Sequence, residues 1–148
     1  DIQPRLIKNY KDNEKEIILN NEVSKKILPI LRKIVTTKEG TASLANVSGY
    51  EIGGKTGTAQ KSAVGGYSNK KINSFISVFP TSKPKFILAI MLDEPKTNKD
   101  YIYYYRDGSN IKYKGTPFNT AGWTTVEVTG QRVEQIGTIL ATKYNKIN

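Results

Sequence analysis

The sequence predicts an α+β fold in which helices pack on an antiparallel sheet. Three observations lead to this class: an amphipathic helical stretch before residue 40, β-rich segments between residues 50 and 92, and a second amphipathic stretch after residue 124. Helices that precede and follow a run of strands, without alternating with them, are typical of this class. The length of 148 residues fits one domain.

The first helix is predicted to begin at Glu22, after a cap at Asn20 or Asn21. Residues 1–20, by contrast, are polar and predicted to be extended. The apolar face of the helix recurs at spacings of three and four residues and comprises Val23, Ile27, Ile30, Leu31, Ile34 and Val35. Pro29 lies within the stretch and lacks a backbone N–H, so we expect it to kink or split the helix.

Two strands are predicted next, at residues 72–79 and 85–92. The apolar run of the second strand is unbroken, which predicts burial on both faces. The letters PTSKP between the strands predict a short turn, so the two strands should pair as an antiparallel hairpin. An extended segment from Glu51 to Gln60, which holds three glycines, precedes them.

Residues 94–122 form a predicted insertion that is dense in tyrosine. Its core, YIYYYRDGSNIKYK, has Asp107-Gly108 at the centre, which indicates a small β-hairpin. The last helix is predicted to start at Thr124, which forms a capping box with Glu127. The apolar face of this helix comprises Val126, Val133, Ile136 and Leu140.

Composition excludes several kinds of site. The chain has no cysteine and no histidine, which rules out disulfides, thiolate metal sites and a Ser-His-Asp triad. We therefore predict no metal and no cofactor, and expect acid–base chemistry to use Lys, Tyr, Asp or Glu. The net charge of +10 is spread along the chain among acidic residues. This pattern favours a solvated basic surface, and we predict that the chain does not bind nucleic acid.

The chain contains no candidate membrane span, because its longest apolar run, FILAIML, is far shorter than the roughly 20 residues that a helix needs to cross a bilayer. The first residue is Asp1, not methionine, and no signal peptide is visible. We expect the chain to be a piece of a longer protein.

The letters GYEIGGKTGTAQ allow two different chemistries for Lys55. Gly49, Gly54, Lys55 and Thr56 match the phosphate-binding pattern G-x-x-x-x-G-K-[ST], and FILAIMLDE resembles a magnesium-binding Walker B strand. Such a nucleotide hydrolase requires a helix that begins directly at GK[ST]. The following residues hold three glycines and no apolar stripe, so a helix is disfavoured there. The P-loop hydrolase remains an alternative.

The same segment contains K-T-G-T, a motif of acyl transfer from a serine. This chemistry requires an extended strand, which the β-branched Thr56 and Thr58 favour. Gly57 lets a peptide ligand lie close to the backbone. Lys55 places a cation beside an anionic substrate end and favours the charged form of nearby hydroxyl groups. The Thr58 N–H can stabilise an oxyanion.

The stretch GTASLANVSGYEIGGKTGTAQK, followed by NSFISVFPTSKPKFILAIMLDEP, resembles the C-terminal part of a class B penicillin-binding protein. The letters DEP after the second strand and AGW at residues 121–123 favour the division-type, FtsI-like enzymes over the elongation-type ones. The resemblance extends in order from about Val23 to Leu140. It implies that residues 1–148 are the C-terminal portion of a partial penicillin-binding transpeptidase fold.

The resemblance implies a serine D,D-transpeptidase that cross-links peptidoglycan stem peptides during cell division and is acylated by β-lactams. Its implied catalytic residues are Lys55 and Thr58, and its implied substrate-binding residues are Lys55, Thr56, Gly57 and Thr58. Lys55 would contact a serine of a second motif, the threonines would hold the substrate carboxylate, and Thr58 N–H would serve the oxyanion hole. The implied parent is anchored in the bacterial inner membrane, faces the periplasm and contacts membrane proteins of the division complex.

Two motifs of the family, S-x-x-K and S-x-N, are not found upstream of K-T-G, where the family has them. The letters S-x-x-K occur only downstream, as Ser68 with Lys71, Ser82 with Lys85 and Ser109 with Lys112, and Tyr67-Ser68-Asn69 imitates the other motif. We reject the three pairs, because the serine and lysine must meet across one turn at the start of a helix. We also reject Tyr67-Ser68-Asn69, which imitates a Y-x-N, because it lies on the wrong side of K-T-G. The isolated chain is therefore expected to be inactive, and a non-catalytic binding module remains a further alternative.

The predicted strand at residues 85–92 is a candidate for self-association. In the family, its far edge pairs with a strand outside this chain. Here that edge would be bare and apolar, and such edges pair readily with other chains. We therefore predict self-association through it.

Overall fold

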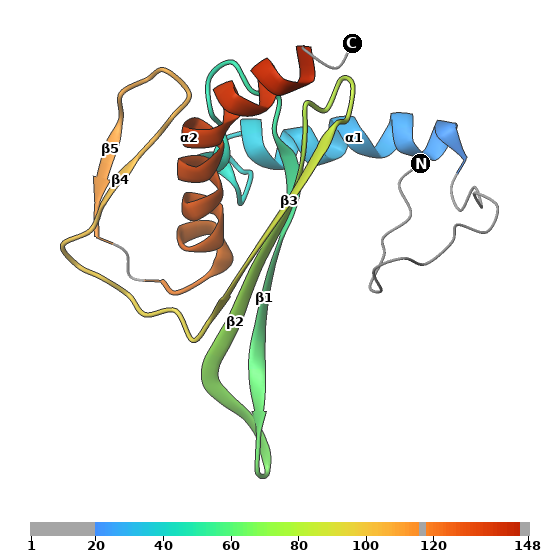
Figure 1. The fold of residues 1–148 in the computed structure, drawn as a ribbon. Coiled ribbons are helices and arrows are strands. Elements are labelled where there is room, and N and C mark those ends of the chain that lie inside the picture. The colour runs from blue at the N-terminus through green and yellow to red at the C-terminus, as the bar shows by residue number, and fades with distance from the viewer. Residues whose placement is uncertain (1–19, 116–117, 146–148) are drawn as a thin grey trace.

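The computed structural model describes residues 20–115 and 118–145 of the chain. In these residues, two long helices accompany a three-stranded antiparallel sheet, and a small two-stranded sheet lies beside the second helix (Figure 1). The predicted α+β class is therefore confirmed. The prediction of an extended segment at residues 1–20 falls, apart from Asn20, outside the described residues.

Helix α1 spans Asn21–Thr36, with Asn20 as its cap. The Asn20 Oδ1 accepts a hydrogen bond from the backbone N–H of Glu22 at 3.0 Å, which satisfies one of the free donors at the helix start. Pro29 lies inside α1, yet the helix is continuous, so of the two expected outcomes, a kink or a split, the split does not occur.

Packing of the following turn accounts for the continuity of α1. Arg32 donates from Nη1 to the carbonyl of Ile52 at 2.7 Å and from Nη2 to Asn46 Oδ1 at 3.1 Å. A Cβ atom on Gly53 would lie 3.0 Å from the backbone nitrogen of Arg32, so the helix backbone sits directly on the first strand. These tertiary contacts offset the single backbone bond that proline removes.

The main sheet has the order β1-β2-β3, and both pairs are antiparallel. Its strands are β1 (Gly53–Ala63), β2 (Gly66–Phe79) and β3 (Phe86–Asp93). The predicted hairpin of β2 and β3 is confirmed. Strands β1 and β2 form a second, longer hairpin that projects away from both helices (Figure 1).

Strand β3 is not buried on both faces, which corrects the sequence-based prediction. Its residues alternate between half-buried and exposed, and Ile87 and Met91 are 77% and 71% exposed. Ile76 of β2 lies on the same face of the sheet as Ile87 and Met91, and it is also exposed. The opposite face, which carries the buried Phe75 and Phe79, is covered within the described residues.

Helix α2 (Thr125–Asn145) supplies that cover. Val126 packs in one core cluster with Phe75, and Val133 packs in a second cluster with Phe79. The predicted apolar face of α2 therefore faces the sheet, with Ile136 and Leu140 half-buried. None of the described helices is long and apolar enough to cross a membrane.

The predicted insertion hairpin is also confirmed. Strands β4 (Ile102–Tyr104) and β5 (Lys112–Lys114) pair in antiparallel fashion around a turn at Asp107-Gly108. Gly108 has a φ of +91°, a conformation that favours glycine. The Asp107 Oδ1 accepts a hydrogen bond from Ser109 N–H at 2.9 Å. The hydrogen bond from the Ser109 side chain, followed by that from its backbone N–H, lowers the pKa of the Asp107 carboxyl.

The predicted capping box at the start of α2 does not form. The Thr124 N–H donates instead to the carbonyl of Ala121 at 3.2 Å, within a short 3₁₀ turn, η2 (Ala121–Trp123). The carboxylate of Glu127 is 2.9 Å from two nitrogens of Arg106. The ion pair forms instead of the cap because leaving a buried carboxylate without a charged partner costs more free energy than leaving one N–H at a helix start without an acceptor.

Candidate functional site

The K-T-G-T segment lies in the middle of β1, which is an outer strand of the sheet in the described part of the chain. Lys55 pairs with Ile76 and Thr58 with Asn73 of β2. No helix begins at Thr56, so the backbone amides cannot converge on a phosphate. The P-loop interpretation is therefore not supported.

The second part of that interpretation, the resemblance of FILAIMLDE to a Walker B strand, is explained by ion pairs. Lys61 Nζ lies 3.0 Å from Asp93 Oδ1 and 2.9 Å from Glu94 Oε1, and Lys70 Nζ lies 3.1 Å from the other oxygen of Glu94. The hydrogen bond from Lys61, followed by that from Lys70, lowers the pKa of Glu94. Through their ion pairs with Lys61, Asp93 and Glu94 link the end of β3 to β1.

Side chains of an extended strand point alternately to opposite faces. Lys55 and Gly57 therefore share one face of β1, and Thr56 and Thr58 share the other. Lys55 is exposed, and its Nζ donates to the carbonyl of Thr56 at 2.7 Å. A Cβ atom on Gly57 would lie 2.6 Å from Ser74 Oγ. Because glycine has no side chain, another chain can approach the backbone of β1 closely at this point.

Both threonine hydroxyls are held by segments outside the sheet. The Thr56 Oγ1 is 2.9 Å from Thr41 Oγ1, in the segment that follows α1. The Thr58 Oγ1 accepts a hydrogen bond from the backbone N–H of Ala121 at 3.0 Å. The sequence assigned no role to Thr41 or Ala121, although both lie in stretches, GTA and AGW, that contributed to the family resemblance.

Asn73 fixes the segment that carries Ala121. It is fully buried opposite Thr58, and its Nδ2 donates to the carbonyl of Asn119 at 2.7 Å and to Thr124 Oγ1 at 2.8 Å. These two acceptors lie on either side of turn η2. The turn is therefore tied to β2 at both ends, directly behind the K-T-G-T segment.

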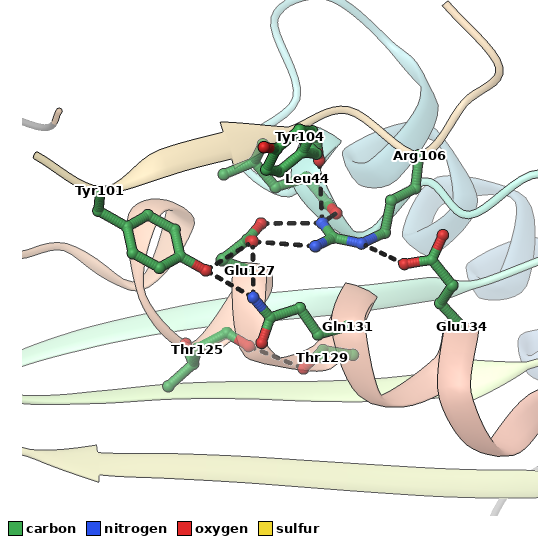
Figure 2. A network of polar contacts seen from close by, with 9 residues as sticks. All are labelled: Leu44, Tyr101, Tyr104, Arg106, Thr125, Glu127, Thr129, Gln131 and Glu134. Atoms are coloured by element: carbon green, nitrogen blue, oxygen red, sulfur yellow. Dashed lines mark hydrogen bonds and ion pairs between the residues drawn. The ribbon is translucent and has the colours of Figure 1, made fainter. Parts of the chain in front are cut away.

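A buried polar network, which the sequence did not predict, joins the insertion to α2 (Figure 2). Arg106 donates to both oxygens of Glu127, to Glu134 Oε2 at 3.1 Å and to the carbonyl of Leu44 at 3.3 Å. Tyr101 donates its hydroxyl proton to Glu127 Oε1 at 3.1 Å. Burial, followed by the charge of Glu127, raises the pKa of the Tyr101 phenol.

The three S-x-x-K pairs lack the geometry of a nucleophile motif. Ser68 and Lys71 lie within strand β2, and Ser82 and Ser109 lie in turns. The Ser68 hydroxyl donates to the carbonyl of Lys61 at 3.1 Å. None of these three serines lies at the start of a helix, which is the position that the motif requires.

Comparison with known proteins identifies the family. Residues 2–111 match the model of the penicillin-binding protein transpeptidase domain. A peptidoglycan D,D-transpeptidase FtsI homolog of Chlorokybus atmophyticus is 39% identical over 100 residues, which cover 63% of this chain and 14% of that protein. A probable peptidoglycan D,D-transpeptidase FtsI of Caulobacter vibrioides is 31% identical over 134 residues, covering 85% of this chain and 20% of that protein.

A solved structure agrees with these relatives. The apo transpeptidase domain of penicillin-binding protein 3 from Burkholderia pseudomallei superimposes with a TM-score of 0.55 at 26% sequence identity. The match covers 78% of this chain and 29% of that one. The chain thus spans less than a third of the length of these proteins, and it belongs to the penicillin-binding protein transpeptidase domain family, of whose domain it forms a part.

Proposed function

We propose that this chain supplies the K-T-G-T wall of the active site of a serine D,D-transpeptidase that cross-links peptidoglycan during cell division. One observation carries the proposal: the backbone of residues 54–60 runs as an extended outer strand, with both threonine hydroxyls held in place. An acyl-transfer enzyme needs such a strand to align an extended peptide substrate. The matches to FtsI-type transpeptidases support the same reaction.

The four residues of the motif have different roles in this proposal. The ammonium group of Lys55 attracts the terminal carboxylate of a stem peptide and contacts a serine of the second motif. The hydroxyls of Thr56 and Thr58 donate hydrogen bonds to that carboxylate, and Gly57 lets the peptide lie close to the strand. The Thr58 N–H stabilises the oxyanion of the tetrahedral intermediate.

The nucleophilic serine is proposed to come from another part of the intact protein. It attacks the carbonyl of the D-Ala-D-Ala amide, the terminal D-alanine leaves with its amine protonated, and an acyl-enzyme remains. An amine of a second stem peptide then displaces the serine and forms the cross-link. We place the intact protein in the inner membrane with its catalytic domain in the periplasm, in contact with membrane proteins of the division complex.

A fluorescent penicillin tests this assignment, because it acylates the active serine of such enzymes. The intact protein should be labelled covalently, whereas Lys55→Ala and Thr58→Val variants should be labelled at least ~10²-fold more slowly, by analogy with the loss of one oxyanion-stabilising or carboxylate-binding group. The isolated 148-residue chain should not be labelled. Absence of labelling in the intact protein, or labelling of a serine in this chain, contradicts the proposal.

We further propose that the isolated chain associates with itself through β3. Its far edge has no partner strand among the described residues, and the adjoining face exposes Ile87, Met91 and Ile76. Unpaired apolar edges favour strand pairing between chains. Light scattering should show concentration-dependent dimers or larger species, and an Ile87→Lys variant should shift the chain toward monomer. A monomer at every concentration contradicts this proposal.

A further inference from the structure

The hydroxyls of Thr56 and Thr58 each form a hydrogen bond with a segment outside the sheet. The tyrosine-rich hairpin, residues 102–114, contacts both of these segments. Thr58 is held by Ala121 in turn η2, and Thr56 by Thr41. These supports lie on the face of β1 opposite Lys55. The hairpin can therefore influence the motif through these two segments.

The stronger connection runs through Trp123. This residue belongs to the same 3₁₀ turn as Ala121. Its ring lies 5.1 Å from the ring of Tyr103, in an edge-on arrangement, and 5.1 Å from the ring of Tyr113. Tyr103 and Tyr113 face each other across β4 and β5, so the indole contacts both strands of the hairpin. Aromatic contacts of this kind fix both the position and the tilt of a ring.

The hairpin is itself anchored to the body of the molecule. The Arg106 side chain is only 6% exposed and holds the carboxylate of Glu127 on α2, as Figure 2 shows. The same guanidinium donates to the carbonyl of Leu44, which lies shortly after Thr41 in the chain. The hairpin therefore contacts the support of Thr58 through Trp123 and the support of Thr56 through Leu44.

The hydrogen bond from Ala121 also sets the direction of the Thr58 hydroxyl. A threonine hydroxyl has one proton to donate and can accept two hydrogen bonds. Because the Ala121 N–H occupies one acceptor position on Oγ1, the Thr58 hydroxyl can direct its proton away from Ala121, toward a different acceptor. A substrate carboxylate beside the outer edge of β1, which is unpaired among the described residues, is such an acceptor. If turn η2 shifted, the hydroxyl would lose this orientation.

We propose that the tyrosine-rich hairpin positions Thr58 for substrate binding by holding turn η2 through Trp123. Trp123 is then a positioning residue, since it acts on the substrate only through Ala121 and Thr58. This inference rests on the proposed transpeptidase function. It adds a role for an insertion that would otherwise be a surface loop.

The test compares Trp123→Ala and Trp123→Phe in the intact protein, with Val133→Ala as a control that removes a buried side chain from the other core cluster. Acylation by a fluorescent penicillin is followed at several concentrations, which separates binding from the acylation step. Trp123→Ala should lower the second-order rate constant about 10- to 100-fold, a range typical of small misplacements in active sites. Trp123→Phe should retain most of the rate, and Val133→Ala should leave it near the wild-type value.

A double-mutant cycle separates positioning from a general loss of structure. If Trp123 acts through Thr58, Trp123→Ala should cause little further loss in a Thr58→Val background. Independent, multiplying effects of the two changes overturn the proposal. Equal acylation rates of wild type and Trp123→Ala also overturn it.

Hydrogen exchange supplies a readout that does not depend on activity. The Ala121 amide is bonded to Thr58 Oγ1, so Trp123→Ala should accelerate its exchange while Val133→Ala should not. Unchanged exchange at Ala121 overturns the positioning role, even in a protein that penicillin does not label. A different result separates the two proposals: penicillin does not label the wild-type protein, yet Trp123→Ala accelerates exchange at Ala121. This result contradicts only the transpeptidase assignment, and it supports the role of Trp123 in holding Ala121 against Thr58.

Discussion

An Arg106→Met substitution removes the cation from the most buried ion pair among the described residues. The side chains of Arg106 and Glu127 are only 6% and 4% exposed. After the change, the Glu127 carboxylate keeps hydrogen bonds from Tyr101 and Gln131 but has no positive charge beside it. Removing one partner of a buried ion pair costs about 3–5 kcal/mol, because the remaining charge is desolvated without compensation.

The expected loss is large enough to measure as a melting temperature. A globular chain gains about 2.1 cal/mol/K of unfolding entropy per residue. For the 148 residues here this amounts to roughly 0.31 kcal/mol/K. A loss of about 3–5 kcal/mol therefore lowers the melting temperature by roughly 10–16 °C. Circular dichroism during heating, with urea unfolding as a second measurement of the free energy, tests this value.

The double variant Arg106→Met with Glu127→Leu is the matched control. Replacing both members of a buried ion pair with apolar side chains of similar volume is often neutral or stabilising. The double variant should therefore recover most of the stability that the single variant loses. A single variant that loses less than about 1 kcal/mol, or a double variant no more stable than the single one, refutes the reasoning.

Two further substitutions test the strand, and a third tests the ion pairs at its end. Gly54→Ala should destabilise the fold by about 1–3 kcal/mol through overpacking, since its Cβ would lie 2.6 Å from the backbone oxygen of Ile76. Gly57→Ala should change stability little, since its Cβ would meet only a movable serine hydroxyl, yet slow penicillin labelling of the intact protein; equal melting temperatures for the two variants contradict this. Glu94→Gln should lower the melting temperature at pH 7, and this difference from wild type should shrink as the pH is lowered. The hydrogen bond from Lys61 depresses the pKa of Glu94 in the folded state, so the contribution is complete above about pH 4.3 and is lost as the pH falls through the depressed value. A difference between wild type and Glu94→Gln that is constant from pH 7 to pH 3 contradicts the assignment.

Local signals in the sequence predicted most elements of the fold. The cap at Asn20, the turn at Asp107-Gly108 and the hairpin of β2 and β3 each depend on neighbouring residues, and all three are present. The burial of β3 was predicted wrongly because it depends on which elements cover the sheet. An apolar run shows that a strand can be buried on both faces, but not that both faces have partners.

The site was only partly predictable, for a similar reason. The extended K-T-G-T strand follows from β-branching and the absence of a helical stripe, which are local properties. The contacts of Thr56 with Thr41 and of Thr58 with Ala121 join residues 15 and 63 positions apart. The failed capping box shows the same effect, because Glu127 pairs with Arg106 from a different element. Such choices are decided by tertiary packing, where local propensity carries little weight.

The long β1–β2 hairpin offers a practical route for spectroscopy. At its tip, Val64 is fully exposed and Gly65, at a φ of +85°, has open space where a side chain would begin. The chain has no native cysteine, so a single cysteine introduced at residue 64 can carry one fluorophore without side reactions. Because β1 runs as one strand from Lys55 to this tip, the dye would report on bending of the strand when a ligand docks along it.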